Sequence, residues 1–515
     1  MEPMRLSLPT RSLTLPGLAL ACLVPVLQAD SQQDACDRWL ARAASNPRLE
    51  LEQVEHEASG SPLVQGYFTV PEDRATGEGR EIQIGMILLP ARAEAPKADP
   101  VWFLHGGPGA GATVFFKREV KGWLRQDRDV ILVDQRGTGS SNGLRVRQPG
   151  SDKDLQTYFE SYFEPERYAA ALPKILERAD PRQYTTPNAV DDFDDLRAAL
   201  GYDQVNLRGG SYGTRSGLIW MRRHPESIRT ATLQGVQSIS FLNPLPHARM
   251  AQRSLDLIFD EVEADPIYAA AFPGLRARFW ETLGRFDEGP IEVEVTHPKS
   301  GEVQTISFSK NAFAEAVRLQ LYTVPTNRRL PLLLNQAHAG DYRALAQASL
   351  AMSRNVRGVI AWGTLISVTG SEDAPRMDRS TIEAECAGTF LGTTRIDEQL
   401  AIIDMWPCGE VAEDFGAPIT VDVPTLLWSG THDPSTAPQW AEETHRSLPN
   451  SVHVVIPSGH GVYGPEVQRV DAAFLDTASI EGLELSEVEA LELPPLVLPE
   501  AAEVPRESRS TRDSG

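Results

Sequence analysis

The chain has 515 residues, 41% of them hydrophobic and 23% charged, with a formal net charge of −22 at neutral pH. These fractions are ordinary for globular proteins and exclude a collagen-like or wholly disordered chain. The acidic balance argues against nucleic acid as a partner, because phosphate recognition requires a basic surface.

The N-terminus predicts a signal peptide over residues 1–29. Arg5 and Arg11 precede a mostly apolar run, and the small residue Ala29 follows it, as in secretory leaders. This pattern favours export to the periplasm or the medium; a cytoplasmic enzyme with an apolar leader is the alternative, and lipidation at Cys22 is the weaker form of export. We expect no stable membrane span, because no segment offers the roughly 20 apolar residues that a bilayer crossing needs.

The next predicted elements are strands of one sheet. Residues 63–70 and 82–89 alternate in polarity and predict two antiparallel strands at the start of the sheet. Short apolar runs typical of strands buried on both faces follow at 101–104, 130–133, 205–207, 231–233, 425–428 and 452–456. Helical stretches at 191–200 and 214–223 lie between them, so the alternation predicts an α/β fold with a mostly parallel sheet. The core would comprise residues 30–236 and 422–476.

Residues 237–421 do not continue this alternation of strands and helices, and they predict a helical cap. Apolar residues recur at helical spacing in 249–264, 311–322, 330–339 and 342–352. A separate tandem domain is the alternative, but the strands that resume at 425 favour an insertion between the sixth and seventh predicted strands. Residues 477–515 are acidic and proline-rich and predict a disordered tail.

The motif that carries chemistry is G-x-S-x-G at residues 209–213, between a predicted strand and a predicted helix. Small residues on both sides of Ser211 allow a tight turn that exposes the hydroxyl at a helix N-terminus. Ser211 is therefore the predicted nucleophile.

The partners of this serine follow later strands, in the order expected for an α/β-hydrolase. His460 would be the general base and Asp433 would orient its imidazole. The backbone N–H groups of Tyr212 and Gly107 would bind the oxyanion. His432 is a rival base, but it follows the wrong strand.

Other charged motifs are predicted to be structural. Asp134 and Arg136 would hold a turn, and Arg215 would anchor a loop. Asp191, Asp192, Asp194 and Asp195 lie where a helix begins, so they suit the helix dipole and only weakly suggest a metal site. We predict no metal and no cofactor.

Five segments together resemble the prolyl aminopeptidase and tripeptidyl aminopeptidase group of α/β-hydrolases. They are His-Gly-Gly-Pro-Gly at 105–109, Asp-Gln-Arg-Gly-Thr-Gly-Ser at 134–140, Gly-Gly-Ser-Tyr-Gly-Thr-Arg at 209–215, Gly-Thr-His-Asp at 430–433 and Gly-His at 459–460. The resemblance implies an exopeptidase that acts on short peptides with a free N-terminus beneath a helical cap. Substrate length and residue preference are not encoded in these motifs.

A carboxylate in the cap would recognise the substrate ammonium group, and we assign this role to Glu372. Glu372 and Asp373 resemble a Cys-x-Glu-Asp segment of the tripeptidyl branch, but Gly370 stands where that branch often has cysteine. Cys386 and Cys408 are candidates for a disulfide, which would leave Cys36 unpaired.

Two other functions compete with the peptidase hypothesis. A carboxylesterase or lipase uses the same triad, and a wholly apolar cap would favour it. A secreted binding protein with a degenerate site is the non-enzymatic alternative, and the complete triad argues against it. Epoxide hydrolases and dehalogenases of this fold use a carboxylate nucleophile, so Ser211 argues against both.

Overall fold

The computed structural model describes residues 24–56 and 59–499. Its centre is a nine-stranded sheet with the order β1-β2-β3-β5-β4-β6-β7-β10-β11. The strands are β1 (Leu49–Glu55), β2 (Pro62–Pro71), β3 (Glu81–Leu89), β4 (Val101–Leu104), β5 (Val130–Val133), β6 (Val205–Gly210), β7 (Ile228–Gln234), β10 (Thr425–Gly430) and β11 (Ser451–Ile456). The strands from β1 to β3 and on to β5 pair antiparallel, and all pairs from β5 to β11 are parallel. The predicted α/β fold and mostly parallel sheet are confirmed.

Strand β1 was not predicted. Its sequence, Leu-Glu-Leu-Glu-Gln-Val-Glu, is rich in glutamate, and only Leu49 at its start is buried. An edge strand can keep polar residues because one side of its backbone and much of its surface face water. The pairing of β1 with β2 therefore reflects tertiary context more than the apolar content of the strand.

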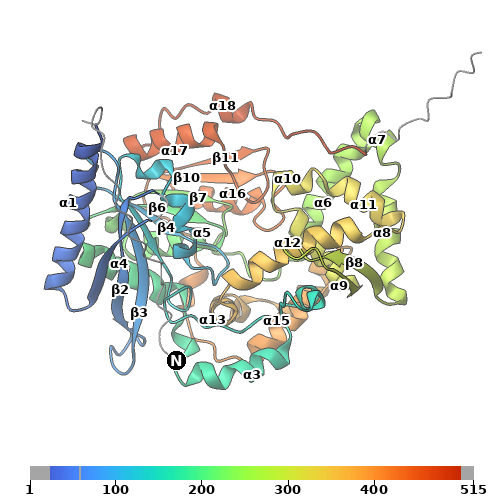
Figure 1. Ribbon diagram of the computed structural model, residues 1–515, viewed down its shortest axis with the longest axis horizontal. Helices are drawn as coiled ribbons and strands as arrows, with labels where there is room; N and C mark the ends of the chain where they lie inside the picture. The colour runs from blue at the N-terminus through green and yellow to red at the C-terminus, as the bar shows by residue number, and fades with distance from the viewer. Residues whose placement is uncertain (1–23, 57–58, 500–515) are drawn as a thin grey trace, which may run out of the picture.

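Helices cover both faces of the sheet (Figure 1). They are α1 (Val24–Ser45), α2 (Phe116–Glu119), α4 (Thr186–Leu200), α5 (Tyr212–Arg223), α16 (Pro438–Ser447) and α17 (Pro465–Thr477). Helix α3 (Pro165–Leu176) lies apart from the sheet, at the bottom of Figure 1. In β4, Trp102 and Leu104 join an apolar cluster with residues of α1, α4, α5 and α16, whereas Val101 and Phe103 pack in another that includes Leu475 of α17. This two-sided burial explains why β4 and β5 are continuously apolar.

The first described helix, α1, belongs to the α/β core. Cys36 and Trp39 are buried, and Trp39 Nε1 donates a 2.9 Å hydrogen bond to the Tyr202 hydroxyl. Residues 1–23 of the predicted signal peptide lie outside the described residues, and a cleavage after Ala29 would fall within α1. Export stays a prediction. Among the helices of the described residues, none combines the length and apolar character that a membrane crossing needs.

The inserted segment lies between β7 and β10, as predicted, and forms the cap at the right of Figure 1. Its helices are α6 (His247–Ala264), α7 (Pro266–Ala271), α8 (Leu275–Arg285), α9 (Lys310–Gln320), α10 (Val324–Asn327), α11 (Leu330–His338), α12 (Arg343–Val359), α13 (Trp362–Glu372), α14 (Ile382–Cys386) and α15 (Thr394–Met405). The cap is not wholly helical, because β8 (Ile291–Thr296) and β9 (Val303–Phe308) form an antiparallel hairpin within it.

The packing divides this segment differently from the predicted boundaries at 237 and 421. Phe259, Phe279 and Phe313 share a separate apolar core with other residues of α6 to α12. Trp362 and Trp406, later in the segment, join the cluster that also contains residues of the central sheet. The second part of the insertion is therefore fixed to the α/β core.

The prediction of a disordered tail is wrong for residues 478–499. Val488 of α18 (Ser486–Glu489) is fully buried, and the chain then runs to the cap (Figure 1). Leu496 N donates to the Tyr268 hydroxyl at 3.1 Å, and Val497 N donates to the Arg328 carbonyl at 2.9 Å. The prediction relied on average composition, in which the many glutamates outweigh the few apolar residues, such as Val488 and Leu496, that are buried. Residues 500–515 lie outside the described residues.

Candidate active site

The nucleophile elbow connects β6 to α5. Ser211 has φ 55° and ψ −127°, a conformation that a non-glycine residue rarely adopts. A Cβ atom at Gly209 would lie 2.8 Å from the Gly213 carbonyl oxygen, and one at Gly213 would lie 2.1 Å from the Leu104 carbonyl oxygen. The two glycines of the motif are therefore required by close backbone contacts, and Ser211 projects at the N-terminus of α5.

His460 and Asp433 follow β11 and β10, and their side chains meet as predicted. Asp433 Oδ2 lies 2.8 Å from His460 Nδ1. Asp433 Oδ1 also accepts hydrogen bonds from the backbone N–H groups of Ser435 and Thr436, each at 2.8 Å. Burial opposes ionisation of Asp433, but the imidazole and these donors outweigh it and lower the pKa of the carboxyl group. The arrangement presents an ionised, oriented carboxylate to the imidazole.

The Asp433 carboxylate keeps His460 basic. Burial is the largest influence and lowers the pKa of His460, but the charge and hydrogen bond of Asp433 outweigh it, so the net pKa is raised above the ordinary value. Thr436, which sequence reasoning missed, donates its hydroxyl to Asp433 Oδ2 at 2.8 Å and lies 3.2 Å from His460 Nδ1. With Nδ1 directed to Asp433, Nε2 remains for the nucleophile.

The cap also holds the base. His460 N donates to the Tyr322 carbonyl at 2.9 Å, and the two rings meet edge to face with centroids 5.2 Å apart. The rival His432 has its Nδ1 2.8 Å from the Thr431 hydroxyl and does not line the cavity that contains Ser211. Burial lowers the pKa of His432 to about 4. These contacts favour His460 as the base.

The oxyanion donors lie beside Ser211. Tyr212 is the first residue of α5, so its N–H has no acceptor within the helix. In the facing loop, Gly106 N donates to His105 Nδ1 at 2.8 Å, which leaves Gly107 N as the second donor. A Cβ at Gly106 would lie 2.9 Å from Ser211 Cβ, so the loop passes close to the nucleophile. The assignment of the Gly107 and Tyr212 N–H groups to an oxyanion hole stays a prediction.

Ser211, His460 and the oxyanion loop open into one cavity of about 480 Å³ between core and cap. Its apolar lining comes from α9, α12 and α13 and the segments between them: Leu319, Met352, Val356, Val359, Ile360, Trp362 and Leu365. Its polar lining includes Asn243, His247, Arg318, Asn355, Arg395 and Gln399. No aspartate or glutamate is among the described residues that line it. The two arginines had no signal in the sequence, because only folding of the cap brings them to Ser211.

Glu372 does not lie where the ammonium hypothesis needs it. Its side chain is fully buried, does not line the cavity, and accepts a 2.6 Å hydrogen bond from the Thr186 N–H at the start of α4. Burial raises its pKa to about 7, although Arg215 opposes this. A backbone N–H in the first turn of a helix has no acceptor within the helix, so this hydrogen bond caps α4 behind the site. The assignment of Glu372 to direct ammonium binding is corrected accordingly.

The other predicted structural charges all have partners. Arg215 donates to Asp373 at 2.8 Å and to the Phe241 carbonyl, so it ties α5 to the cap segment. Arg136 forms a buried two-point ion pair with Asp192, at 2.7 and 2.8 Å. Asp191, Asp194 and Asp195 lie in the middle of α4 rather than in its first turn, so the expected match to the helix dipole is wrong. They pair instead with Arg48, Arg74, Arg197, Arg223 and His224. Within residues 24–56 and 59–499, no three His, Cys, Asp or Glu side chains group as a metal site requires.

The predicted disulfide between Cys386 and Cys408 is absent. Both thiols are free, as is that of Cys36, and Cys22 lies outside the described residues. Cys408 instead faces Gly370, the position where the tripeptidyl branch often has cysteine: a Cβ there would lie 2.3 Å from Cys408 Sγ. Because Cys386 and Cys408 are close in sequence, they were predicted to pair, but the residue that lies against Cys408 in the fold is Gly370.

A family model described as the alpha/beta hydrolase fold matches residues 99–466. The chain belongs to this family. The matched region contains the predicted triad and the cap inserted between β7 and β10. With the oriented histidine and Ser211 in one cavity, this α/β-hydrolase is a serine hydrolase.

Several curated relatives of this α/β-hydrolase are named as peptidases. The tripeptidyl aminopeptidase of Streptomyces coelicolor is 28% identical over 221 residues, 38% of each chain, so the match spans about two fifths of that relative's length. The serine protease Hip1 of Mycobacterium tuberculosis is 22% identical over 434 residues, 77% of this chain and 80% of that one. The proline iminopeptidase of Neisseria gonorrhoeae is 30% identical over 142 residues, 27% of this chain and 34% of the relative.

Among solved structures, an esterase from Exiguobacterium antarcticum is 15% identical with a TM-score of 0.34, covering 77% of this chain and 96% of that one.

Proposed function

We propose that the protein is a serine exopeptidase that releases N-terminal residues, proline, or di- and tripeptides from short peptides. The observation that carries the proposal is that Ser211, Gly107 and His460 line one cavity between core and cap, with Asp433 bonded to His460 behind it. The names of the relatives support peptide substrates. The chain matches only parts of the aminopeptidases, so the whole activity remains a proposal.

The geometry accounts for acyl transfer. His460 Nε2 accepts the Ser211 hydroxyl proton as Oγ attacks the scissile carbonyl carbon, and the N–H groups of Gly107 and Tyr212 stabilise the oxyanion. His460 then gives the proton to the leaving amine nitrogen as the C–N bond breaks and an ester on Ser211 forms. Water attacks this ester, His460 takes its proton, and the proton returns to Ser211 as the acid leaves.

The cap supports short substrates. Residues of α9, α12, α13 and α15 stand over Ser211 and enclose about 480 Å³, a volume in the range of small-ligand sites. Because Glu372 does not reach the cavity, neutral side-chain oxygens such as those of Asn355 and Gln399 are the candidates to receive the free amino group.

A carboxylesterase is the second candidate. The specific observation in its favour is the apolar wall formed by Met352, Val356, Val359 and Ile360, together with the absence of carboxylates from the described lining. Such a wall suits an acyl chain as well as an apolar side chain. The same triad would cleave either bond.

The test is a profile of peptide anilides of one, two and three residues, each with a free and an acetylated N-terminus, beside short-chain 4-nitrophenyl esters. The peptidase proposal expects kcat/KM to be highest for a free N-terminus at one defined length. Faster cleavage of acetylated peptides, or hydrolysis of esters alone, would refute it. Labelling with a fluorophosphonate, lost in Ser211→Ala, confirms which residue is acylated.

A further inference from the structure

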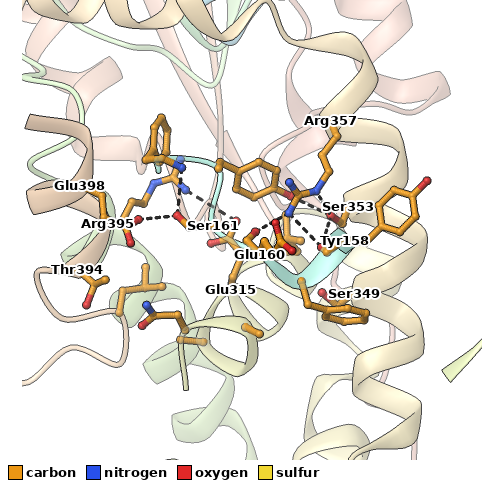
Figure 2. A pocket seen from close by; sticks show the side chains of 18 residues that line it. Tyr158, Glu160, Ser161, Glu315, Ser349, Ser353, Arg357, Thr394, Arg395 and Glu398 are labelled. Carbon is orange, nitrogen blue, oxygen red and sulfur yellow. Dashed lines mark hydrogen bonds and ion pairs between the residues drawn. The ribbon is translucent and has the colours of Figure 1, made fainter. Parts of the chain in front are cut away.

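The charge of the catalytic cavity is not balanced by the residues that line it. Arg318 of α9 and Arg395 of α15 both line the cavity with Ser211, and no described lining residue is acidic. The cavity wall continues into an adjoining pocket that shares Tyr162, Leu319 and Arg395 with it (Figure 2). The partners of each arginine decide whether either is available to a ligand.

Arg318 is fully engaged. Its Nε donates to Glu315 Oε2 at 2.7 Å, with a second contact between Nη2 and Oε1 at 2.5 Å, and its Nη1 donates to the Tyr322 hydroxyl at 2.7 Å. Burial would raise the pKa of Glu315, but Arg318 outweighs it and lowers the pKa to about 2. Glu315 is therefore an ionised partner committed to Arg318.

Arg395 has no comparable partner. Its guanidinium carbon lies 4.8 Å from the centre of the Phe163 ring, and its Nη1 is 3.8 Å from Glu315 Oε1, beyond hydrogen-bond distance. Its Nε is buried without a hydrogen-bond partner. The structure gives Arg395 no hydrogen bond to any described residue, while 22% of its side chain remains exposed within these pockets.

The two other carboxylates that line the adjoining pocket do not pair with Arg395. Glu160 lies 3.8 Å from Arg167 and makes no ion pair with Arg395 within 4 Å. Glu398, one turn further along α15, accepts a 2.5 Å hydrogen bond from the Ser161 hydroxyl and makes no ion pair with Arg395 within 4 Å (Figure 2). Burial raises the pKa of Glu398, which disfavours its charged form. Two arginines therefore share one committed carboxylate, and a desolvated cation with free donors is costly unless a ligand pairs with it.

We propose that Arg395 determines specificity by binding a carboxylate of the substrate. A guanidinium offers two parallel donors that match a carboxylate, and Arg395 faces the cavity that contains the nucleophile. The inference rests on the proposed peptidase function and narrows it: the substrate carries a carboxylate within a few residues of the scissile bond. Its source is the free C-terminus of a di- or tripeptide or an acidic side chain.

The experiment compares substrate pairs that differ only in this charge. Trialanine is compared with its C-terminal amide, and Ala-Asp amide with Ala-Asn amide, for the wild type, Arg395→Gln and Arg395→Lys. In the wild type, one charged member should be favoured in kcat/KM by roughly 10- to 100-fold, the value of a charged hydrogen-bonded contact. Which pair shows the preference identifies the source of the carboxylate.

In Arg395→Gln this preference should vanish through a rise in KM for the charged substrate, while the amide is cleaved as by the wild type. Arg395→Lys should retain part of it. Arg357→Gln is the matched control: Arg357 lines the adjoining pocket, but it is bonded to Ser353 and to two backbone carbonyls, so its loss should leave the acid-to-amide ratio unchanged.

The acid-to-amide ratio is the kcat/KM of the charged substrate divided by that of its uncharged partner. If peptides are cleaved but this ratio is near one in the wild type for both pairs, or is unchanged in Arg395→Gln, the inference is overturned. If no peptide is cleaved but esters are, the proposed function fails instead. The 4-nitrophenyl monoester of succinate, which keeps a free carboxylate, is then compared with the 4-nitrophenyl ester of butyrate, which has none. An equal fall in kcat/KM for both esters in Arg395→Gln overturns the proposed carboxylate site.

Discussion

Gly370 of α13 and Cys408 face each other closely enough for a covalent link. A Cβ atom at Gly370 would lie 3.5 Å from Cys408 Cβ and 2.3 Å from its Sγ, and disulfides join Cβ atoms about 3.5–4.5 Å apart. We predict that Gly370→Cys forms a disulfide with Cys408 and stabilises the fold by about 3 kcal/mol under oxidising conditions.

Thiol counting by mass spectrometry and thermal unfolding with and without reductant measure this prediction. Gly370→Ala is the control: it has the same Cβ and no sulfur, so it should crowd the thiol and gain nothing from oxidation. An unchanged number of free thiols in oxidised Gly370→Cys would contradict the prediction.

Two glycines near Ser211, Gly106 in the facing loop and Gly210 in the elbow, should differ sharply in how they tolerate an added Cβ atom. Gly106→Ala should reduce kcat by at least about 100-fold, because its Cβ would press on Ser211 and shift the loop that carries an oxyanion donor. Gly210→Ala is the matched control on the other side of Ser211, since nothing lies within 4 Å of a Cβ there. Steady-state kinetics on a cleaved anilide compares them; equal losses in the two variants would sink the steric argument.

The 2.8 Å contact of Asp433 with His460 should govern rate and pH dependence. The kcat/KM of the wild type should fall as pH drops through the pKa of His460, because only neutral imidazole accepts the Ser211 proton, and that pKa lies above the ordinary 6.5. Asp433→Asn should reduce kcat by about 10⁴-fold and shift this acid limb to lower pH. A pH–rate profile with an unmoved acid limb would show that Asp433 does not tune the base.

Glu372 should make stability fall with rising pH. Its folded-state pKa of about 7 exceeds the ordinary 4.5, so between these values the folded protein holds more protons than the unfolded chain. The stabilisation is fully present below about pH 4.5 and is lost as pH rises through about 7, with a magnitude of up to about 3 kcal/mol.

Denaturant unfolding of the wild type and Glu372→Gln at about pH 5 and pH 8 tests this sign. Glu372→Gln should remove that part of the pH dependence and should leave the ratio of rates on free and acetylated peptides unchanged. A selective loss on free N-termini would restore the ammonium role that the buried position of Glu372 argues against.

The C-terminal segment should hold the cap to the core. Leu496 is 3% exposed and packs in the cap's apolar core, so Leu496→Ala should destabilise the protein by about 2 to 4 kcal/mol. Leu498→Ala, at a side chain 41% exposed, should cost well under 1 kcal/mol. Urea unfolding measures both variants, and similar midpoints would mean that the segment does not support the cap.

The sequence by itself determined the chemistry at the ends of the strands. Buried parallel strands are continuous apolar runs, and their carboxyl ends meet at one edge. Ser211, Asp433 and His460 could therefore be predicted from the sequence, and the structure brings Asp433 to His460 and places His460 in the cavity with Ser211. The turn at Ser211 could also be predicted from the local sequence, because the close backbone contacts at positions 209 and 213 require glycine there.

Tertiary structure alone decided what surrounds that chemistry. Burial and pairing depend on residues far apart in the chain: Glu372 looked like an exposed cap carboxylate but lies against α4, and Cys408 faces Gly370 rather than Cys386. Arg395 becomes significant only because α15 folds beside Ser211 while Glu315 pairs with Arg318. Local patterns record backbone constraints, whereas the electrostatics of a cavity are set by which side chains the folded chain brings together.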